Sequence, residues 1–298
     1  MQIIKVQDPK YVTEKIYSVT WEITKKCNYK CSYCDIFGEY SQEDSTDETI
    51  LFINNFGKNR NLRVTLFGGE PTTHPNLVTI LKKLKNKVSL FTNMSESIEY
   101  YEDLIKVNPN IEILATYHPS KVDFFYFFKK IKILSKKNTV IKVTFMLDPT
   151  IPLDYKNNYA KLRSLNIRIE IHKVVYKKNR VKNNAIEDNL VAEDSSRVIE
   201  VTYEDQTKLI TSSEYLLSNR LNNFKFFKCC GGLNNLYISN KGFVYSCLDY
   251  RRQKKEIGHV TNLNIADLRG TICMLDQCTS DLELPKERVL FTAEVVHT

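Results

Sequence analysis

"TKKCNYKCSYCDIFGEY" (residues 24–40) carries three cysteines within eight positions, Cys27, Cys31 and Cys34. The first two are separated by three residues, one more than in the CxxC of a zinc knuckle or a thioredoxin-like redox pair. A structural zinc site would need a fourth ligand, and the nearest candidate, Asp35, suits a thiolate-rich site poorly. Because soft thiolates also select iron–sulfur clusters, the pattern favours a cubane cluster with one iron left open to a small molecule.

The segments around this stretch alternate short β-rich runs with helical patterns. Six strands are predicted at 17–24, 62–69, 88–93, 111–118, 139–147 and 167–175. Four helices are predicted between them, at 74–87, 95–108, 121–137 and 154–166. Ser95 is the predicted N-cap of the second helix, and Pro75 lies in the predicted first turn of the first helix. Since apolar strands flanked by helices form parallel sheets, we predict an α/β fold with a partial (β/α)6 TIM-like barrel.

A second motif, "LFGGEP" (66–71), stands at the end of the second predicted strand, and Tyr33 directly precedes the last cysteine of the first motif. The combination resembles the radical S-adenosylmethionine (radical SAM) superfamily, and the resemblance covers most of the chain. In that family three cysteines bind a [4Fe-4S] cluster, and the methionine moiety of SAM chelates the fourth iron. Electron transfer into the sulfonium then yields a 5′-deoxyadenosyl radical that abstracts a hydrogen atom from the substrate.

The resemblance assigns roles to residues near the carboxyl ends of the predicted strands, where barrels of this kind place their chemistry. It implies that the first cluster is bound by Cys27, Cys31 and Cys34. It implies contacts to SAM from Tyr33, Gly68, Gly69, Glu70, Thr92, Asn93 and His118. The two glycines let the backbone approach the ligand closely, and the carboxylate pairs with the methionine ammonium. The catalytic residues are not identified, and the candidates by position, each of which also fits a loop cap or a core group, are Tyr117, His118, Asp148 and His172.

The other five cysteines follow much later in the chain, at Cys229, Cys230, Cys247, Cys273 and Cys278. The pattern "NLYISNKGFVYSC" (235–247) predicts a β-hairpin with its turn at "NKG". The following segment, 264–275, is predicted to be helical and to bring two more cysteines close. Four thiolates are the number that a fully ligated [4Fe-4S] centre requires.

This region resembles the auxiliary-cluster extensions of radical SAM enzymes, the SPASM domain and its shorter form, the Twitch domain. The cysteine count fits the Twitch domain, with one auxiliary [4Fe-4S] cluster. The implied ligands are Cys229, Cys247, Cys273 and Cys278, with Cys230 as an alternative to Cys229. The closing Cys-x4-Cys departs from the common Cys-x2-Cys and puts Cys273 in question as a ligand. A four-cysteine zinc site is the competing interpretation.

We therefore predict three segments: a radical SAM core at 1–180, a connector with a helix at 181–223, and a Twitch-type domain of hairpin and helix at 224–298. Residues 177–196 are polar and nearly featureless. Within the connector a strand is predicted at 197–203 and a helix at 204–221.

The chain of 298 residues has a formal charge of +8, which fits an anionic substrate or a nucleic-acid surface. Its basic residues are scattered in pairs, so we interpret them as solvated helix faces and expect no nucleic-acid partner. The sequence shows no signal peptide, and its most apolar stretch, 122–134, is too short to span a membrane and contains three lysines. Eight cysteines in such a chain favour metal or redox chemistry over disulfides, and we expect a cytoplasmic protein.

These observations predict an enzyme that cleaves SAM reductively and abstracts hydrogen from a polar small molecule. The auxiliary cluster would accept an electron, so that the outcome is an oxidation such as dehydrogenation, and flavodoxin or ferredoxin would serve as electron donor. The first alternative is a maturase of ribosomally made peptides. Against it, the first predicted strand starts near residue 17 and leaves no room for the peptide-recognition domain that such maturases often carry ahead of the barrel. The second alternative is a zinc-stabilised binding protein.

Overall fold

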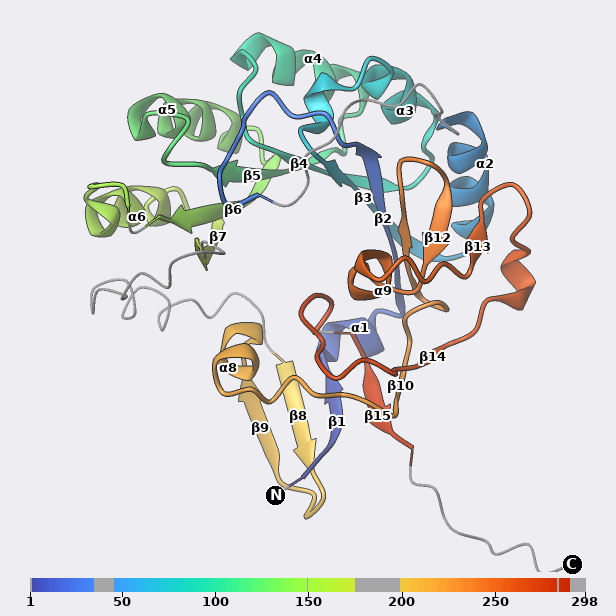
Figure 1. The fold of residues 1–298 in the computed structure, drawn as a ribbon. Coiled ribbons are helices and arrows are strands. Elements are labelled where there is room, and N and C mark those ends of the chain that lie inside the picture. The colour runs from blue at the N-terminus through green and yellow to red at the C-terminus, as the bar shows by residue number, and fades with distance from the viewer. Residues whose placement is uncertain (1, 35–45, 149, 175–198, 283, 290–298) are drawn as a thin grey trace, which may run out of the picture.

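The computed structural model describes residues 2–34, 46–148, 150–174, 199–282 and 284–289, which form two β-sheets (Figure 1). The polar stretch 177–196 lies outside the described residues. The larger sheet consists, in spatial order, of β13 (Gly258–His259), β12 (Phe243–Tyr245), β11 (Asn235–Ile238), β2 (Ile16–Thr24), β3 (Asn61–Gly68), β4 (Lys87–Thr92), β5 (Glu112–Tyr117), β6 (Val140–Leu147) and β7 (Arg168–Lys173).

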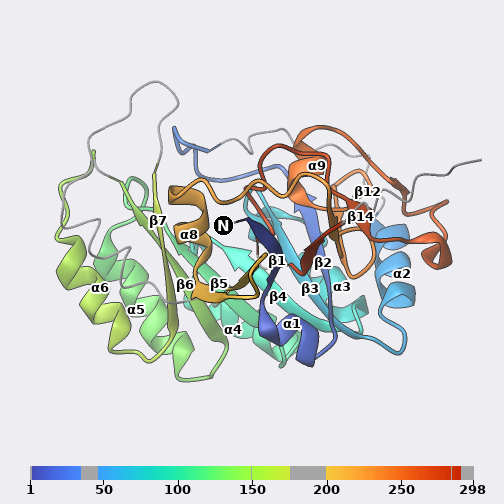
Figure 2. The same cartoon turned by 90° about the horizontal axis from the view of Figure 1, so that it is seen from below.

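Strands β2 to β7 pair in parallel and in sequence order, as the six predicted strands require. The segments that connect them contain η1 (Pro71–Thr73) and the helices α2 (Thr46–Phe56), α3 (Leu77–Lys83), α4 (Ile98–Val107), α5 (Phe124–Ser135) and α6 (Tyr155–Arg163). Figure 2 shows these helices along one face of the sheet. The predicted α/β class is thus confirmed, in a sheet whose edges among the described strands are β7 and β13.

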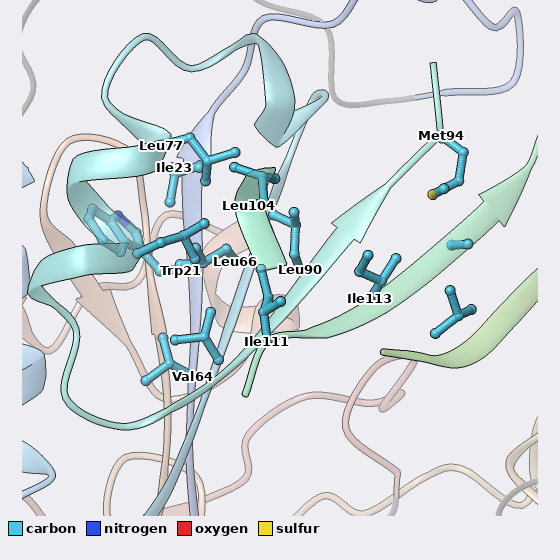
Figure 3. Close-up of a cluster of buried hydrophobic side chains, with 14 of the residues drawn as sticks. Trp21, Ile23, Val64, Leu66, Leu77, Leu90, Met94, Leu104, Ile111 and Ile113 are labelled. Carbon is cyan, nitrogen blue, oxygen red and sulfur yellow. The ribbon is translucent and has the colours of Figure 1, made fainter. Parts of the chain in front are cut away.

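The helix-covered face of the sheet holds the main hydrophobic core. On β2, Trp21 and Ile23 point toward the helices and pack with Leu66 of β3 and Leu90 of β4 (Figure 3), and Val19 belongs to the same core. All five are at most 2% exposed, and each contributes about 1.5–3 kcal/mol through removal of its apolar surface from water. Because side chains alternate along a strand, the intervening polar residues of β2 point to the opposite face.

The predicted hairpin is confirmed as β11 and β12, whose register pairs Tyr237 with Tyr245. The hairpin also joins the larger sheet. Strand β11 pairs in parallel with β2, so that Asn235 lies opposite Ser18. The hydroxyl of Ser18 donates to the Asn235 Oδ1 at 2.6 Å and fastens this junction. The hairpin therefore extends the barrel-like sheet.

A second sheet joins segments from all three predicted parts of the chain. In spatial order it consists of β14 (Thr271–Ile272), β10 (Phe227–Cys229), β15 (Lys286–Arg288), β1 (Ile3–Gln7), β8 (Ile199–Tyr203) and β9 (Lys208–Thr211). All its pairings are antiparallel. Val6, Val201 and Phe224 belong to its own hydrophobic core. The prediction that the first strand starts near residue 17 is wrong, because β1 precedes it and α1 (Pro9–Thr13) leads from β1 to β2.

Two predicted helices in the second half of the chain are wrong. In place of a helix at 204–221, the chain turns, forms β9 and then the short α8 (Ser213–Ser218). Asp205 makes this turn, since its carboxylate accepts from the N–H and the hydroxyl of Thr207 at 3.0 and 2.6 Å. The segment 264–275 forms only a 3₁₀ turn, η2 (Ile265–Asp267), followed by β14, which pairs with β10.

The first halves of two predicted helices also need correction. Helix α4 begins at Ile98 with Ser97 as its N-cap, because the Ser97 hydroxyl accepts from Tyr100 N–H at 3.2 Å. Ser95, the predicted cap, instead accepts a hydrogen bond from Asn28. Pro75 lies before the first turn of α3 rather than in it. Helix α2 was not predicted at all.

Among the described residues, none of the helices combines the length and hydropathy needed to cross a bilayer.

Candidate functional site

The end of β3 is packed against the start of the cysteine loop through its two glycines. Gly69 N–H donates to Thr24 C=O, and Glu70 N–H donates to Lys26 C=O, each at 2.8 Å. A Cβ on Gly69 would lie 2.1 Å from the Lys26 oxygen. Gly68 has φ +144° and would place a Cβ 2.0 Å from the Thr24 oxygen. The absence of side chains is thus required for contact between backbone segments, whereas the sequence interpretation ascribed it to the ligand.

Glu70 is the buried centre of this region, with 1% of its surface exposed. Its carboxylate accepts from Asn93 N–H at 2.7 Å and from the N–H and hydroxyl of Thr72 at 3.1 and 2.8 Å. Burial raises the pKa of Glu70, while these hydrogen bonds oppose the rise. Within the described parts of the chain Glu70 forms no salt bridge. Since buried carboxylates are normally paired, this position favours a bound cation.

Asn93 connects Glu70 to the cysteine loop. Its side-chain amide donates to Asn28 Oδ1 at 2.8 Å, and Asn28 in turn donates to the Ser95 hydroxyl at 2.7 Å. Asn28 directly follows Cys27 in the chain. The end of β4 therefore holds the first cysteine in position relative to the carboxylate at the end of β3.

The three thiols of the first motif lie near one another. Cys27 Sγ accepts from Tyr29 N–H at 3.3 Å, and Cys34 N–H donates to Cys31 C=O at 3.1 Å. Burial raises the pKa of Cys27, and the proximity of Glu70, Cys31 and Cys34 raises it further. Within the described residues, no three His, Cys, Asp or Glu side chains are arranged to hold a single metal ion.

His118 and Tyr33 meet beside this motif. The His118 Nδ1 lies 2.8 Å from Tyr33 Oη and 3.8 Å from Cys31 Sγ. The two rings stack, with centroids 6.2 Å apart and 14° between their planes. Burial, and secondly the charge of Lys121, lowers the pKa of His118 to about 4. The imidazole is therefore neutral at neutral pH and can accept the Tyr33 hydroxyl proton in a hydrogen bond.

Two predicted site residues face the helices instead. Tyr117 is fully buried, packs against Phe145 and Phe127 in the core, and its hydroxyl has no hydrogen-bond partner among the described residues. The hydroxyl of Thr92 lies 2.9 Å from that of Tyr101 on α4, and it also acts to lower the pKa of Glu70, so Thr92 borders that carboxylate.

The other two candidate catalytic residues are Asp148 and His172. Asp148 is completely buried, and its carboxylate accepts from the N–H and hydroxyl of Thr150 at 3.0 and 2.7 Å, as a loop cap does. It is close enough to raise the pKa of Cys31 and Tyr33. His172 has a largely exposed side chain whose Nε2 lies 3.9 Å from the Glu170 carboxylate.

The C-terminal cysteines surround a cavity. The cysteines that line it are Cys229, Cys247, Cys273 and Cys278. Cys230 is not among its lining residues, although it neighbours Cys229 in the chain.

Asp249 brings two walls of this cavity together. It lies in the first turn of α9 (Leu248–Arg252), directly after Cys247. Its carboxylate accepts from Thr279 N–H and Ser280 N–H at 2.7 and 3.1 Å, in the loop that follows Cys278. Burial opposes ionisation, but these hydrogen bonds and the nearby Arg252 lower the pKa of Asp249. A charged carboxylate thus holds the Cys247 and Cys278 segments side by side.

The thiols of the cavity differ in environment. Burial raises the pKa of Cys247 to about 12 and also raises that of Cys278. The pKa of Cys229 is lowered, first by a hydrogen bond from the Cys230 thiol and then by the charge of Lys286, against the effect of burial.

A buried ion pair that the sequence analysis did not identify joins the two halves of the molecule. Glu22, on β2 shortly before the first cysteine motif, has 3% of its side chain exposed. Its Oε2 accepts from Arg251 Nη2 and from the hydroxyl of Tyr237, each at 3.1 Å. Arg251 lies on α9, four residues after Cys247. The only signal in the sequence was a glutamate inside the apolar strand "YSVTWEIT", and it did not indicate which residue would pair with it.

Removal of the positive charge of Arg251 should therefore destabilise the fold. We expect Arg251→Met to lower the free energy of unfolding by about 3 kcal/mol, because it leaves the Glu22 carboxylate buried without its ion pair. The matched control is Arg63→Met, which removes the half-exposed Arg63–Glu14 pair and should cost no more than about 1 kcal/mol. Urea unfolding of both apoproteins measures the difference, and equal losses would contradict the assigned role of Arg251.

Comparison with known proteins places this geometry in context. Residues 21–148 match the family model of the Radical SAM superfamily. No curated protein sequence matches the chain. The fold is similar to that of SuiB from Streptococcus suis bound to S-adenosylmethionine, with a TM-score of 0.56 and 14% identity, over 81% of this chain and 63% of that one. The chain thus spans less than two thirds of that chain's length.

Two further solved structures share the fold. One is Streptococcus suis SuiB bound to precursor peptide SuiA, with a TM-score of 0.55 and 14% identity over 87% of this chain and 66% of that chain. The other is native anSMEcpe with bound AdoMet and Cp18Cys peptide, with a TM-score of 0.54 and 14% identity over 84% and 79%. At this level of identity the likeness is one of fold.

Proposed function

We propose that the chain, whose residues 21–148 match the family model of the Radical SAM superfamily, is an enzyme that cleaves SAM reductively at a [4Fe-4S] cluster and oxidises a polar substrate with the help of a second cluster. The observation that carries the proposal is the arrangement around the first motif. Cys27, Cys31 and Cys34 lie together beside the buried carboxylate of Glu70. Asn93, just after β4, donates hydrogen bonds to Glu70 and to Asn28, which follows Cys27, and so fixes their relative positions.

The residues of the first site fit a cluster and its SAM ligand. The motif supplies three thiols, and a cluster held by three cysteines would leave one iron available. Glu70, buried and without a salt bridge in the described parts of the chain, would pair with the methionine ammonium. Tyr33 and His118 form a stacked pair next to Cys31 and would border the adenine. When bound, the cluster supplies the electron that splits SAM into methionine and the 5′-deoxyadenosyl radical.

The cavity at the C-terminal cysteines supports the second cluster. Four thiols, those of Cys229, Cys247, Cys273 and Cys278, line one cavity. Four thiolates are the number that a fully ligated [4Fe-4S] centre requires, so the donor set fits the cluster. The ligands we propose are Cys229, Cys247, Cys273 and Cys278.

The second site suits an electron acceptor. With four thiolate ligands, its iron atoms have no open position for a substrate. The protein would hold the substrate between the two sites, which the ion pair of Glu22 and Arg251 joins. Loss of a hydrogen atom and then of one electron and one proton oxidises the substrate by two electrons. We propose flavodoxin or ferredoxin as the external electron carrier.

The substrate class we propose is a polar small molecule. The sheet face opposite the helices carries charged side chains, among them Lys142 and Glu170, which form a buried ion pair at 2.7 Å. Arg168 donates to the same carboxylate at 2.7 Å. Two cations facing one carboxylate suit a substrate with an anionic group. A peptide is the second candidate, since structures of similar fold contain a precursor peptide and a Cp18Cys peptide.

The metal content of anaerobically purified protein tests the proposal. We expect brown protein with about eight iron atoms per chain, four for each cluster. With SAM and dithionite it should form 5′-deoxyadenosine and methionine in equal amounts, as measured by chromatography. Colourless protein that contains zinc and leaves SAM intact would contradict the proposal and support a zinc-stabilised binding protein.

A further inference from the structure

Lys286 is a buried cation at the cavity of the second site. It lies on β15, directly opposite Cys229 of β10 in the antiparallel register, with Val6 of β1 on its other side. Directly opposed residues have their side chains on one face, with Cβ atoms about 4.5–5.5 Å apart. Lys286 is 4% exposed and lines the cavity together with the four cysteines.

The ammonium group is held in place by backbone carbonyls. Lys286 Nζ donates to the carbonyl oxygens of Asp281, Leu282 and Leu284 at 2.5, 3.3 and 3.0 Å. It also lies 5.6 Å from the centre of the Phe224 ring. An ammonium has three N–H groups, and three carbonyls accept from it. Its influence on the neighbouring thiols is therefore mainly that of a fixed positive charge.

The charges around the cavity make this cation distinctive. Among the described residues that line the cavity, Lys286 is the one basic side chain, and the acidic ones are Asp249 and Asp281. Asp249 is bonded to the 279–280 loop and to Arg252, which offsets its charge. Lys286 lies opposite Cys229 in the strand register and lines the same cavity as Cys247, Cys273 and Cys278, so a positive charge is fixed beside the proposed ligands.

We infer that Lys286 is the fixed countercharge of the second cluster site and raises its reduction potential. The inference rests on the proposed function, because it assumes a [4Fe-4S] cluster in this cavity. A cluster with four thiolates is anionic, and uptake of one electron adds one negative charge. A buried cation stabilises the reduced form more than the oxidised form, and net charge and burial are among the factors that set such potentials. The site is thereby suited to accept the single electron that a substrate radical gives up.

The test is a redox titration of the anaerobic full-length protein, followed by electron paramagnetic resonance. Addition of SAM distinguishes the clusters, since only the first should change its signal. Lys286→Gln removes the charge but keeps N–H donors for the carbonyls. We expect its second cluster to be at least tenfold harder to reduce, a shift of about 59 mV for one electron. Lys286→Arg keeps the charge and should shift the equilibrium far less.

Lys225→Met is the matched control, because Lys225 is a partly exposed lysine bonded to Asp276 and does not line the cavity. It should leave both potentials unchanged. An unchanged second potential in a Lys286→Gln protein that holds both clusters would overturn the inference and leave the proposed function intact. If Lys286→Gln loses the second cluster, retention by Lys286→Arg supports the countercharge, and loss in both variants overturns it. Wild-type protein with only about four iron atoms would contradict the second cluster itself.

Discussion

Cys34→Ala is expected to abolish reductive cleavage of SAM by the anaerobically reconstituted protein. Cys34 is one of only three thiols at the first site, and its N–H bond to Cys31 C=O fixes the turn that presents two of them. Without it, two thiolates remain for a cluster that needs three protein ligands. We expect the rate of 5′-deoxyadenosine formation to fall by more than about a hundredfold, since changes merely behind the ligands of metal sites already cost 10–100-fold.

The control for this prediction is Ser32→Ala, a change at an exposed position between Cys31 and Cys34. It should keep cleavage near the wild-type rate and leave the iron content unchanged. Cleavage by the Cys34→Ala protein at the wild-type rate would remove this cysteine from the proposed ligands. The measurement needs only SAM and dithionite, so it does not depend on the identity of the substrate.

Cys247→Ala is expected to remove the second cluster and to leave the first in place. Cys247 lines the cavity and begins α9, where Asp249 ties its segment to the loop after Cys278. Loss of one of four thiolates should lower the iron content from about eight to about four per chain. Cleavage of SAM should continue, because the first site is unaltered, whereas oxidation of the substrate should be lost with the electron acceptor.

Cys230→Ala is the matched control, because Cys230 is the neighbouring thiol that does not line the cavity. It should retain about eight iron atoms per chain. A loss of four iron atoms in Cys230→Ala but not in Cys229→Ala would show that Cys230, and not Cys229, is the ligand. If Cys247→Ala keeps the full iron content and its electron paramagnetic resonance signals, the proposed ligand set of the second site is wrong.

The parallel half of the fold was predictable because its strands are defined locally. Val19, Trp21 and Ile23 alternate with polar residues on β2, and each of the next five strands is followed or preceded by a helical pattern. The strands of the second sheet are only two to five residues long, and apart from the pair β8 and β9 their partners are far away in sequence. In the segment 204–221, helix-forming residues masked the turn at Asp205 and the pairing of β9 with β8.

The candidate site was likewise predictable only in part. Spacing along the chain identified the cysteine motif and the segment with Glu70, because both sit in continuous stretches of sequence. Spacing alone left Cys229 and Cys230 undecided, and the register of β10 against β15 was needed to place Cys229 opposite Lys286. The ion pair of Glu22 and Arg251 depends on which elements meet in space, so neither residue could be named beforehand.

The position of β1 between β8 and β15 has a consequence for biosynthesis. Val6 pairs with Val201 on one side and with Lys286 on the other, so this strand must wait for the last part of the chain to leave the ribosome. Strands β2 to β6 find their partners nearby in sequence and can form their contacts earlier, since local contacts form faster. The strand that carries Cys229 lies beside β15, so the second cysteine site is completed after the first.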